Sequence, residues 1–273
     1  MIFMSTKVFE KLEMPGVSNI IVVASGKGGV GKSTIAVNLA VSLARQGFKT
    51  ALLDADLYGP SVPMMFGVQN IKPSGTKKNG KEVIVPIEKF GVKMVSIGFF
   101  VPPGQSLIWR GPLVSNGLTQ LFRDTDWGEI DYMIVDFPPG TGDIQITTIQ
   151  KLNLAGAVIV TTPQDVALSD ARKAAAMFTN PDLNVPILGI VENMAWFTPA
   201  QHPDEKYFIF GTGGGEKMAA EFHTKLLGQI PIVLEIRSVS DNGKTIYNQP
   251  DKTVIETFDK ISDQITELVK VKK

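Results

Sequence analysis

Short apolar runs rich in β-branched residues alternate along the chain with segments of helical periodicity. Most of these runs lack the apolar–polar alternation of a half-exposed strand, as is typical of parallel strands with helices on both faces. The pattern therefore predicts an α/β fold with a doubly wound, mostly parallel sheet. The predicted strands are residues 20–24, 50–53, 92–97, 132–135, 157–161 and 187–192. The predicted helices are residues 32–46, 115–122, 145–151, 167–178 and 215–222.

Residues 70–86 do not fit this alternation, because they are mostly polar and centre on the dipeptide Asn79-Gly80. Asn-Gly favours the two-residue turn of a β-hairpin, so we expect a small hairpin outside the main sheet. Residues 1–17 are interpreted as an N-terminal leader segment in the structural sense alone. Residues 18–273 are expected to form a single domain that ends in a helix.

Composition restricts the classes of partner. Lysine plus arginine and aspartate plus glutamate each number 27, so no net charge draws the chain toward nucleic acid or an anionic membrane. No apolar stretch reaches the roughly 18 to 20 residues of a membrane span, and the first residues lack the features of a signal peptide. The absence of cysteine excludes disulfides, thiolate metal ligands and cysteine nucleophiles from the chain's own chemistry. We expect a cytoplasmic protein that binds neither nucleic acid nor a membrane.

The segment SGKGGVGKST, residues 25–34, follows a predicted buried strand and leads into a predicted helix. Its spacing fits the phosphate-loop pattern G-x-x-x-x-G-K-S/T, and the strand–loop–helix context argues against a glycine-rich turn that matches by chance. Glycines let backbone N–H groups curve around a polyphosphate at the positive end of the helix dipole. Lys32 would neutralise the terminal phosphates, and the Ser33 hydroxyl would bind Mg²⁺. The predicted nucleotide-binding residues of this loop are Gly26, Lys27, Gly28, Gly29, Val30, Gly31, Lys32, Ser33 and Thr34.

Acidic residues follow two other predicted strands. Asp136 ends the run YMIVD and precedes Pro-Pro-Gly, which ends the strand. Asp54 and Asp56 lie at the carboxyl end of the second strand, the edge at which open α/β sheets bind ligands. Either could position an attacking water or hold the metal shell, and the alternative is that they cap the following turn. The predicted metal ligands are Ser33, Asp54 and Asp136.

Several further segments occur in a fixed order after the phosphate loop: LLDADLYGPSVP, SIGFF, IWRGP, DWGEIDYMIVDFPPGTGD, GAVIVTTPQDVALSDARKA, GIVENMAWF and IFGTGGGEKMA. Together they resemble the Mrp/ApbC family of iron–sulfur cluster carrier ATPases, over roughly residues 18–250. That family belongs to the deviant Walker A group of P-loop NTPases, with MinD, ParA and the nitrogenase iron protein. The resemblance implies that ATP and Mg²⁺ are bound and that a homodimer hydrolyses ATP slowly. It also implies iron–sulfur scaffolds or client apo-proteins as partners.

The resemblance implies roles for individual residues. Lys27 matches the signature lysine that reaches across the homodimer to the phosphates held by the other subunit. Asp56 matches the aspartate that orients the attacking water, and Asp136 matches the Walker B acid. Asn193, in VENM, matches the residue that reads the adenine edge. The predicted catalytic residues are thus Lys27, Lys32, Asp56 and Asp136, although from the residues alone Lys27 could also be a solvated loop lysine.

The region expected to bind the cluster departs from the family pattern. Members that carry clusters usually place a Cys-x-x-Cys pair shortly after the ENM strand, so that two subunits supply the thiolates of one bridging cluster. The corresponding stretch here, MAWFTPAQHPDEKYFIFG, contains no cysteine, so cluster binding by the usual ligands does not carry over. His202, Asp204 and Glu205 lie in this stretch and could hold a metal, but three polar residues in a turn are more often solvated.

Three other features have two interpretations each. Trp109 and Arg110 could contact a partner or a nucleotide, although packing of the tryptophan on the core is favoured. The glycines from Gly211 could form a second anion loop, but we favour a loop that leads into the next helix. A C-terminal stripe at helical spacing indicates either a helix docked on the core, which we favour, or a membrane-surface helix of the MinD type. The stripe consists of Val254, Phe258, Ile261, Ile265 and Leu268, followed by Lys270, Lys272 and Lys273.

Two function classes remain open. The ordered motifs favour an ATPase that carries or helps to assemble iron–sulfur clusters. The alternative is a positioning ATPase of the MinD/ParA type, which binds a membrane surface or cargo through its nucleotide-dependent dimer and would use the C-terminal helix.

Overall fold

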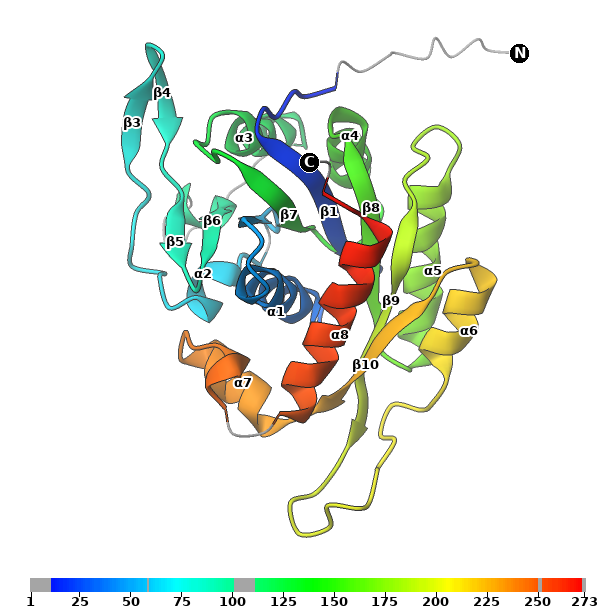
Figure 1. Ribbon diagram of the computed structural model, residues 1–273. Helices are drawn as coiled ribbons and strands as arrows, with labels where there is room; N and C mark the ends of the chain where they lie inside the picture. The colour runs from blue at the N-terminus through cyan, green and yellow to red at the C-terminus, as the bar shows by residue number, and fades with distance from the viewer. Residues whose placement is uncertain (1–10, 58, 101–110, 250–251, 272–273) are drawn as a thin grey trace, which may run out of the picture.

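The computed structural model describes residues 11–57, 59–100, 111–249 and 252–271. Within these residues, eight strands form one sheet in the order β10-β9-β8-β1-β7-β2-β6-β5 (Figure 1). Every neighbouring pair is parallel except β5 with β6, which confirms the predicted α/β fold. The strands are β1 (Val17–Ser25), β2 (Thr50–Asp54), β5 (Ile87–Lys89), β6 (Val92–Ser96), β7 (Ile130–Asp136), β8 (Leu154–Thr161), β9 (Ile187–Phe197) and β10 (Leu226–Ile232).

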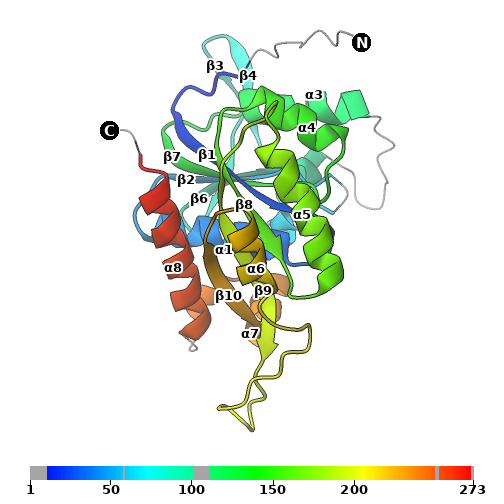
Figure 2. The same ribbon diagram turned by 90° about the vertical axis from the view of Figure 1, so that its right-hand side faces the viewer.

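Helices cover both faces of the sheet, as Figure 2 shows for α8 and α5 on opposite sides. One face carries α1 (Lys32–Arg45), α2 (Val62–Met65), α7 (Leu234–Asp241) and α8 (Thr253–Leu268). The other face carries α3 (Gly111–Arg123), α4 (Asp143–Lys151), α5 (Asp165–Thr179) and α6 (Gly214–Glu221). Two 3₁₀ turns, η1 (Ile97–Phe100) and η2 (Ile246–Asn248), follow β6 and α7 along the chain.

Successive residues of the central strands face opposite cores. In β1, Ile21 and Val23 pack on the α1 side and Val22 packs on the α5 side, and all three are fully buried. Burial of each such side chain contributes about 1.5–3 kcal/mol of hydrophobic free energy. Because both faces are covered, both sets of positions must be apolar, which explains why the sequence lacks apolar–polar alternation.

A separate hairpin of β3 (Gly75–Lys78) and β4 (Lys81–Ile84) lies away from the sheet (Figure 1). Its turn residues Asn79 and Gly80 both have positive φ, at 52° and 79°. Positive φ at both central residues is what a type I′ turn requires. The hairpin expected within residues 70–86 is therefore confirmed.

The structure also contains helices and strands that the sequence pattern did not predict, namely α2, β5, α7 and β10. The strand β10 includes Gly228 and Pro231, which interrupt a strand pattern and are tolerated here because β10 is an edge strand. The strand β9 continues beyond its predicted end at residue 192 to Phe197. The glycines from Gly211 lead into α6, as expected, with Gly213 at φ 71° before the helix. Trp109 and Arg110 lie outside the described residues.

The segment between β9 and α6, residues 198–213, projects from the body of the molecule and is called the arm below (Figures 1 and 2). Its base is closed by two backbone hydrogen bonds, from Phe197 N to Tyr207 O at 2.9 Å and from Tyr207 N to Phe197 O at 2.8 Å. The Lys206 ammonium also lies 4.2 Å from the ring centroid of Trp196. Residues 198–206 of the arm thus form a closed loop on a fixed base.

The end of β9 also fixes the start of α6. The buried carboxylate of Glu192 accepts hydrogen bonds from the Gly215 N–H and from Gln229 Nε2. A carboxylate at a helix N-terminus satisfies backbone donors that the helix leaves free. Both ends of the arm are therefore attached to the same strand.

The C-terminal stripe docks on the core rather than facing solvent. Val254, Phe258, Ile261 and Ile265 of α8 are buried in the cluster that also contains α1 and β10, whereas Leu268 is 45% exposed. Ser42 of α1 donates to Asp259 Oδ1 at 2.8 Å, which adds a polar tie between the two helices. The favoured interpretation of a docked helix is confirmed. Among the described residues, no helix combines the length and apolarity needed to cross a membrane.

Substitution of Phe258 by Ala should destabilise the fold by about 3–5 kcal/mol, because the side chain is fully buried and leaves a cavity. The matched control Leu268→Ala, on the same helix, should cost less than about 1 kcal/mol. Urea denaturation followed by circular dichroism measures both values. Equal losses in the two variants would show that α8 is not docked as described.

Candidate functional site

The loop between β1 and α1 lies at the carboxyl edge of the parallel strands. Gly29 and Gly31 have φ values of 83° and 87°, in the left-handed region that side chains disfavour. Gly26 lies against α5, where an added Cβ would come within 2.0 Å of the backbone carbon of Asp170. Curvature and close approach thus account for glycine at these three positions.

Neighbouring strands hold this loop through hydrogen bonds. Ser25 Oγ donates to Lys27 O at 2.9 Å, and the Gly140 N–H, from the turn after β7, donates to Ser25 O at 2.9 Å. Asn193 Nδ2, near the end of β9, donates to Val30 O at 2.9 Å. The loop is therefore preorganised by β7 and β9.

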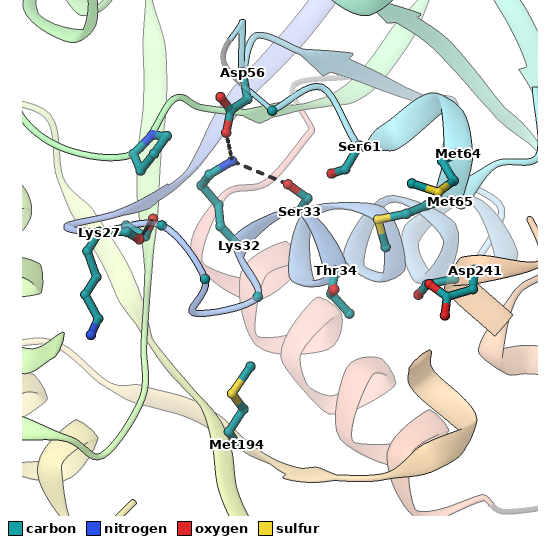
Figure 3. A pocket seen from close by; sticks show the side chains of 17 residues that line it. Lys27, Lys32, Ser33, Thr34, Asp56, Ser61, Met64, Met65, Met194 and Asp241 are labelled. Carbon is teal, nitrogen blue, oxygen red and sulfur yellow. Dashed lines mark hydrogen bonds and ion pairs between the residues drawn. The ribbon is translucent and has the colours of Figure 1, made fainter. Parts of the chain in front are cut away.

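Lys32 is the centre of a buried charge cluster. Its Nζ lies 2.6 Å from Asp136 Oδ1 and 3.2 Å from Asp56 Oδ2, the latter drawn in Figure 3. The side chain of Lys32 is 6% exposed and that of Asp136 is fully buried. The strand register places Asp54 opposite Asp136 on one side and opposite Ser96 on the other. The ends of β2, β6 and β7 therefore bring the predicted acids together at the phosphate loop.

Burial and charge oppose each other within this cluster. Burial acts to lower the pKa of Lys32, but the Asp136 and Asp56 carboxylates outweigh it, so that the pKa is raised. Burial raises the pKa of Asp136, against the opposite effect of Lys32. Burial and then the charge of Asp136 raise the pKa of Asp54 to about 8. One buried cation faces three carboxyl groups, so the cluster is short of positive charge.

The cluster has donor atoms suited to a divalent cation. Asp56 Oδ1 and Asp136 Oδ2 are buried and have no hydrogen-bond partner within the described residues. Buried carboxylate oxygens without partners are costly, and Mg²⁺ prefers oxygen ligands of this kind. The Ser33 hydroxyl lies nearby, 3.5 Å from Lys32 Nζ. Ser33 and Asp136 therefore fit the magnesium site predicted from the sequence.

Asp54 differs from Asp56 and Asp136 in its hydrogen bonds. Like Asp136, it is fully buried and is not part of the pocket lining, but both of its oxygens accept hydrogen bonds from protein groups. Asp54 lies at the end of β2, as predicted, but its two oxygens bind the Asp56 N–H and the Ser96 hydroxyl instead of facing the pocket.

A pocket of ≈ 570 Å³ lies over the phosphate loop (Figure 3). Pockets of this size accommodate ligands as large as a nucleotide. The lining includes loop residues together with Lys32 and Asp56. It also includes residues that the sequence did not predict, namely Met64, Met65, Met194, Ser240 and Asp241. The sequence pattern gives little indication of these residues. The helix α2 has only four residues, too few to show helical periodicity, and α7 follows the edge strand β10, which the pattern did not predict.

Lys27 lines the same pocket, but its ammonium points away from that of Lys32 (Figure 3). Within the described residues, the Lys27 ammonium has no hydrogen-bond or ion-pair partner. The two lysines of the loop therefore have different surroundings: one is locked between carboxylates and the other is open to a further anion.

The structure does not assemble a metal site in the arm. His202 Nδ1 lies 3.3 Å from Glu205 Oε1, and both side chains are exposed. Asp204 does not complete the group, since no cluster of three potential metal ligands occurs among the described residues. The three polar residues are therefore a solvated turn in this structure.

The first strand of the parallel sheet runs through a glycine-rich loop into a helix, and the lysine of that loop pairs with an aspartate at the end of another strand. These features define a P-loop NTPase. The comparisons with known proteins agree. The chain belongs to the family of NUBPL iron-transfer P-loop NTPases, whose profile matches residues 16–266. This confirms the resemblance to the iron–sulfur cluster carrier ATPases.

One curated relative is an iron-sulfur cluster carrier protein of Aquifex aeolicus, which is 47% identical over 266 residues, 97% of this chain and 71% of the relative. A solved structure of a nucleotide-binding protein from Archaeoglobus fulgidus, in complex with ADP, is 35% identical. It matches with a TM-score of 0.75 over 87% of this chain and 91% of that one. The cell division ATPase MinD of Pyrococcus furiosus, at 21% identity and a TM-score of 0.64 over 92% of this chain and 99% of its own, shows the shared fold.

Gly26→Ala should lower thermal stability and abolish tight nucleotide binding, because the added methyl group would meet the α5 backbone rather than a movable side chain. The matched control for thermal stability is Gly28→Ala in the same loop, where an added Cβ meets no protein atom within 4 Å. Differential scanning calorimetry measures the stability of both variants, and titration with ADP measures binding by Gly26→Ala. An equal melting temperature in the two variants would contradict the close approach of the loop to α5.

Proposed function

We propose that this chain is a Mg²⁺-dependent ATPase that works in iron–sulfur cluster assembly or transfer through a nucleotide-dependent homodimer. The observation that supports it most directly is the Lys32–Asp136–Asp56 cluster beneath a preorganised phosphate loop, in a chain of the iron-transfer family. The name of the Aquifex relative and the ADP bound to the Archaeoglobus structure support the same activity.

Lys32 and the loop N–H groups would bind the β- and γ-phosphates of ATP. In the structure Lys32 is already charged and held at the pocket by Asp136 and Asp56, so binding exchanges carboxylate partners for phosphate. Ser33 and Asp136 would hold Mg²⁺, which supplies charge neutralisation to the phosphates when bound. Asp56 would then be free to orient the attacking water through its carboxylate.

Lys27 would complete the site from a second copy of the chain. Its open ammonium lines the pocket without an acidic partner among the described residues. A cation that arrives with dimerisation would stabilise the charge that develops on the transferring phosphoryl group. Hydrolysis would therefore be slow in the monomer and coupled to association.

Asn193 would read the adenine edge with Oδ1, which accepts no hydrogen bond within the described residues. Its Nδ2 is engaged by Val30 O, which leaves Oδ1 to accept a hydrogen bond from the exocyclic amine of adenine. The same side chain would thus link the phosphate loop to the base.

The iron–sulfur cluster would be cargo whose thiolate ligands come from a partner. The chain has no cysteine, and the described residues contain no alternative group of three metal ligands. The proposed role is therefore that of an ATPase acting with a cysteine-bearing scaffold or client. A membrane-positioning role is less well supported, because the apolar stripe of α8 is buried against the core.

Lys27→Ala should leave ADP affinity within about 3-fold while lowering ATP turnover by about 100-fold or more, because it removes a cation that acts on the transition state. Asp56→Ala should also lower turnover with binding retained, whereas Lys32→Ala should weaken binding itself. Phosphate release, calorimetric titration and light scattering with ATP separate these effects. Lys77→Ala, in the exposed hairpin, is the control, and an unaltered rate in Lys27→Ala would refute the proposed role.

Anaerobic reconstitution with ferrous iron and sulfide should leave the chain without stoichiometric iron after desalting, with or without ATP, because it lacks thiolate ligands. Iron assay and visible absorbance measure the outcome, and retained ADP binding shows that the sample is folded. Stoichiometric iron on the isolated chain would mean that its own residues hold the cluster.

A further inference from the structure

Asp54 occupies the middle of a row formed by three adjacent strand ends. The parallel register pairs it with Ser96 at the end of β6 and with Asp136 at the end of β7. All three residues are fully buried. A carboxyl group in such a place needs protein partners for its oxygens.

The two oxygens of Asp54 have those partners. The Ser96 hydroxyl donates to Oδ2 at 2.8 Å, and the Asp56 backbone N–H donates to Oδ1 at 3.1 Å. Ser96 Oγ itself accepts from the Gly98 N–H at 2.9 Å, at the start of η1. A short chain of hydrogen bonds therefore runs from η1 through β6 to the residue that carries the Asp56 carboxylate.

The bond to Asp56 fixes the direction of the chain as it leaves β2. An aspartate that accepts from the N–H two residues later closes a local turn in place of regular strand pairing. Farther along the same loop, Pro60 packs closely on Gly98, since an added Cβ at Gly98 would lie 2.8 Å from Pro60 Cβ. Asp54 and η1 thus hold the loop that carries Asp56 at both of its ends.

We propose that Asp54, supported by Ser96, is a positioning residue that aims the Asp56 carboxylate at the nucleotide pocket, and is not itself a metal ligand. This inference rests on the proposed ATPase activity for its catalytic consequence. Asp56 Oδ2 lies 3.2 Å from Lys32 Nζ, and Asp56 Oδ1 has no partner within the described residues. The direction of this carboxylate therefore depends on where the turn places residue 56. Misplacement of a reacting group by about 1 Å can cost 100-fold in rate.

The test compares Asp54→Ala with Asp54→Asn in the full chain. Asparagine has the same shape, accepts from the Asp56 N–H through its oxygen and can donate to Ser96 Oγ, but it is a poor ligand for Mg²⁺. We expect Asp54→Ala to lower kcat by at least about 10-fold. The KM for ATP and the half-saturating Mg²⁺ concentration should stay within about 3-fold, and Asp54→Asn should restore most of kcat.

A double-substitution cycle shows whether Asp54 acts through Asp56. In an Asp56→Ala background, Asp54→Ala should change kcat by less than about 2-fold, because the group that it positions is absent. Ser96→Ala should give a smaller loss of kcat than Asp54→Ala. The control Ser42→Ala removes an equally buried hydroxyl at the α1–α8 contact and should reduce stability without changing kcat.

Amide hydrogen exchange gives a readout that does not need hydrolysis. A peptide that contains the Asp56 amide should exchange faster in Asp54→Ala than in the wild-type chain or in Asp54→Asn. A wild-type chain with no ATPase activity would refute the proposed function, and exchange would still test the positioning role. An Asp54→Asn variant as slow as Asp54→Ala with a raised Mg²⁺ requirement, additive losses in the cycle, or unchanged exchange would each overturn the inference.

Discussion

The buried ion pairs of Lys32 are the interaction on which the rest of the site depends. A lysine enclosed to this degree is stable as a cation because Asp136 and Asp56 lie within 2.6 Å and 3.2 Å of its ammonium. The same pairs tie the start of α1 to the ends of β2 and β7, so helix, loop and sheet edge form one unit. Since this unit carries more acid than base, it has an electrostatic affinity for added positive charge.

The sheet supplies the geometry that makes these pairs possible. Parallel strands end at a common edge, and their register puts Ser96, Asp54 and Asp136 side by side although they are far apart in the sequence. Two-sided burial leaves this framework little freedom, because each central strand packs on helices through alternate side chains. Chemical groups at the strand ends therefore sit on a rigid support, while the loops that follow them can differ in their length and composition.

Much of this arrangement could be predicted from the sequence, and the parts that could not have identifiable reasons. The loop from Gly26 to Ser33 and the acid at Asp136 are local patterns, in which each residue's role follows from its neighbours. The bond from Asn193 to Val30 joins segments 163 residues apart, and the Asp54–Ser96 bond depends on strand register. Met194 and Asp241 were missed as pocket residues because a strand extension and an edge strand with Gly228 and Pro231 gave no regular pattern.

Because the base of the arm is closed, the sequence of the arm can vary independently of the phosphate loop. The Phe197–Tyr207 hydrogen bonds shut the arm off from the strand, and Glu192 anchors the helix that follows it. Insertions, deletions or exchanged residues beyond that closure leave the strand, and with it the phosphate loop, unaffected. The lack of cysteine in the arm therefore carries no information about the integrity of the phosphate loop, because the two are joined through β9 and not through the arm itself.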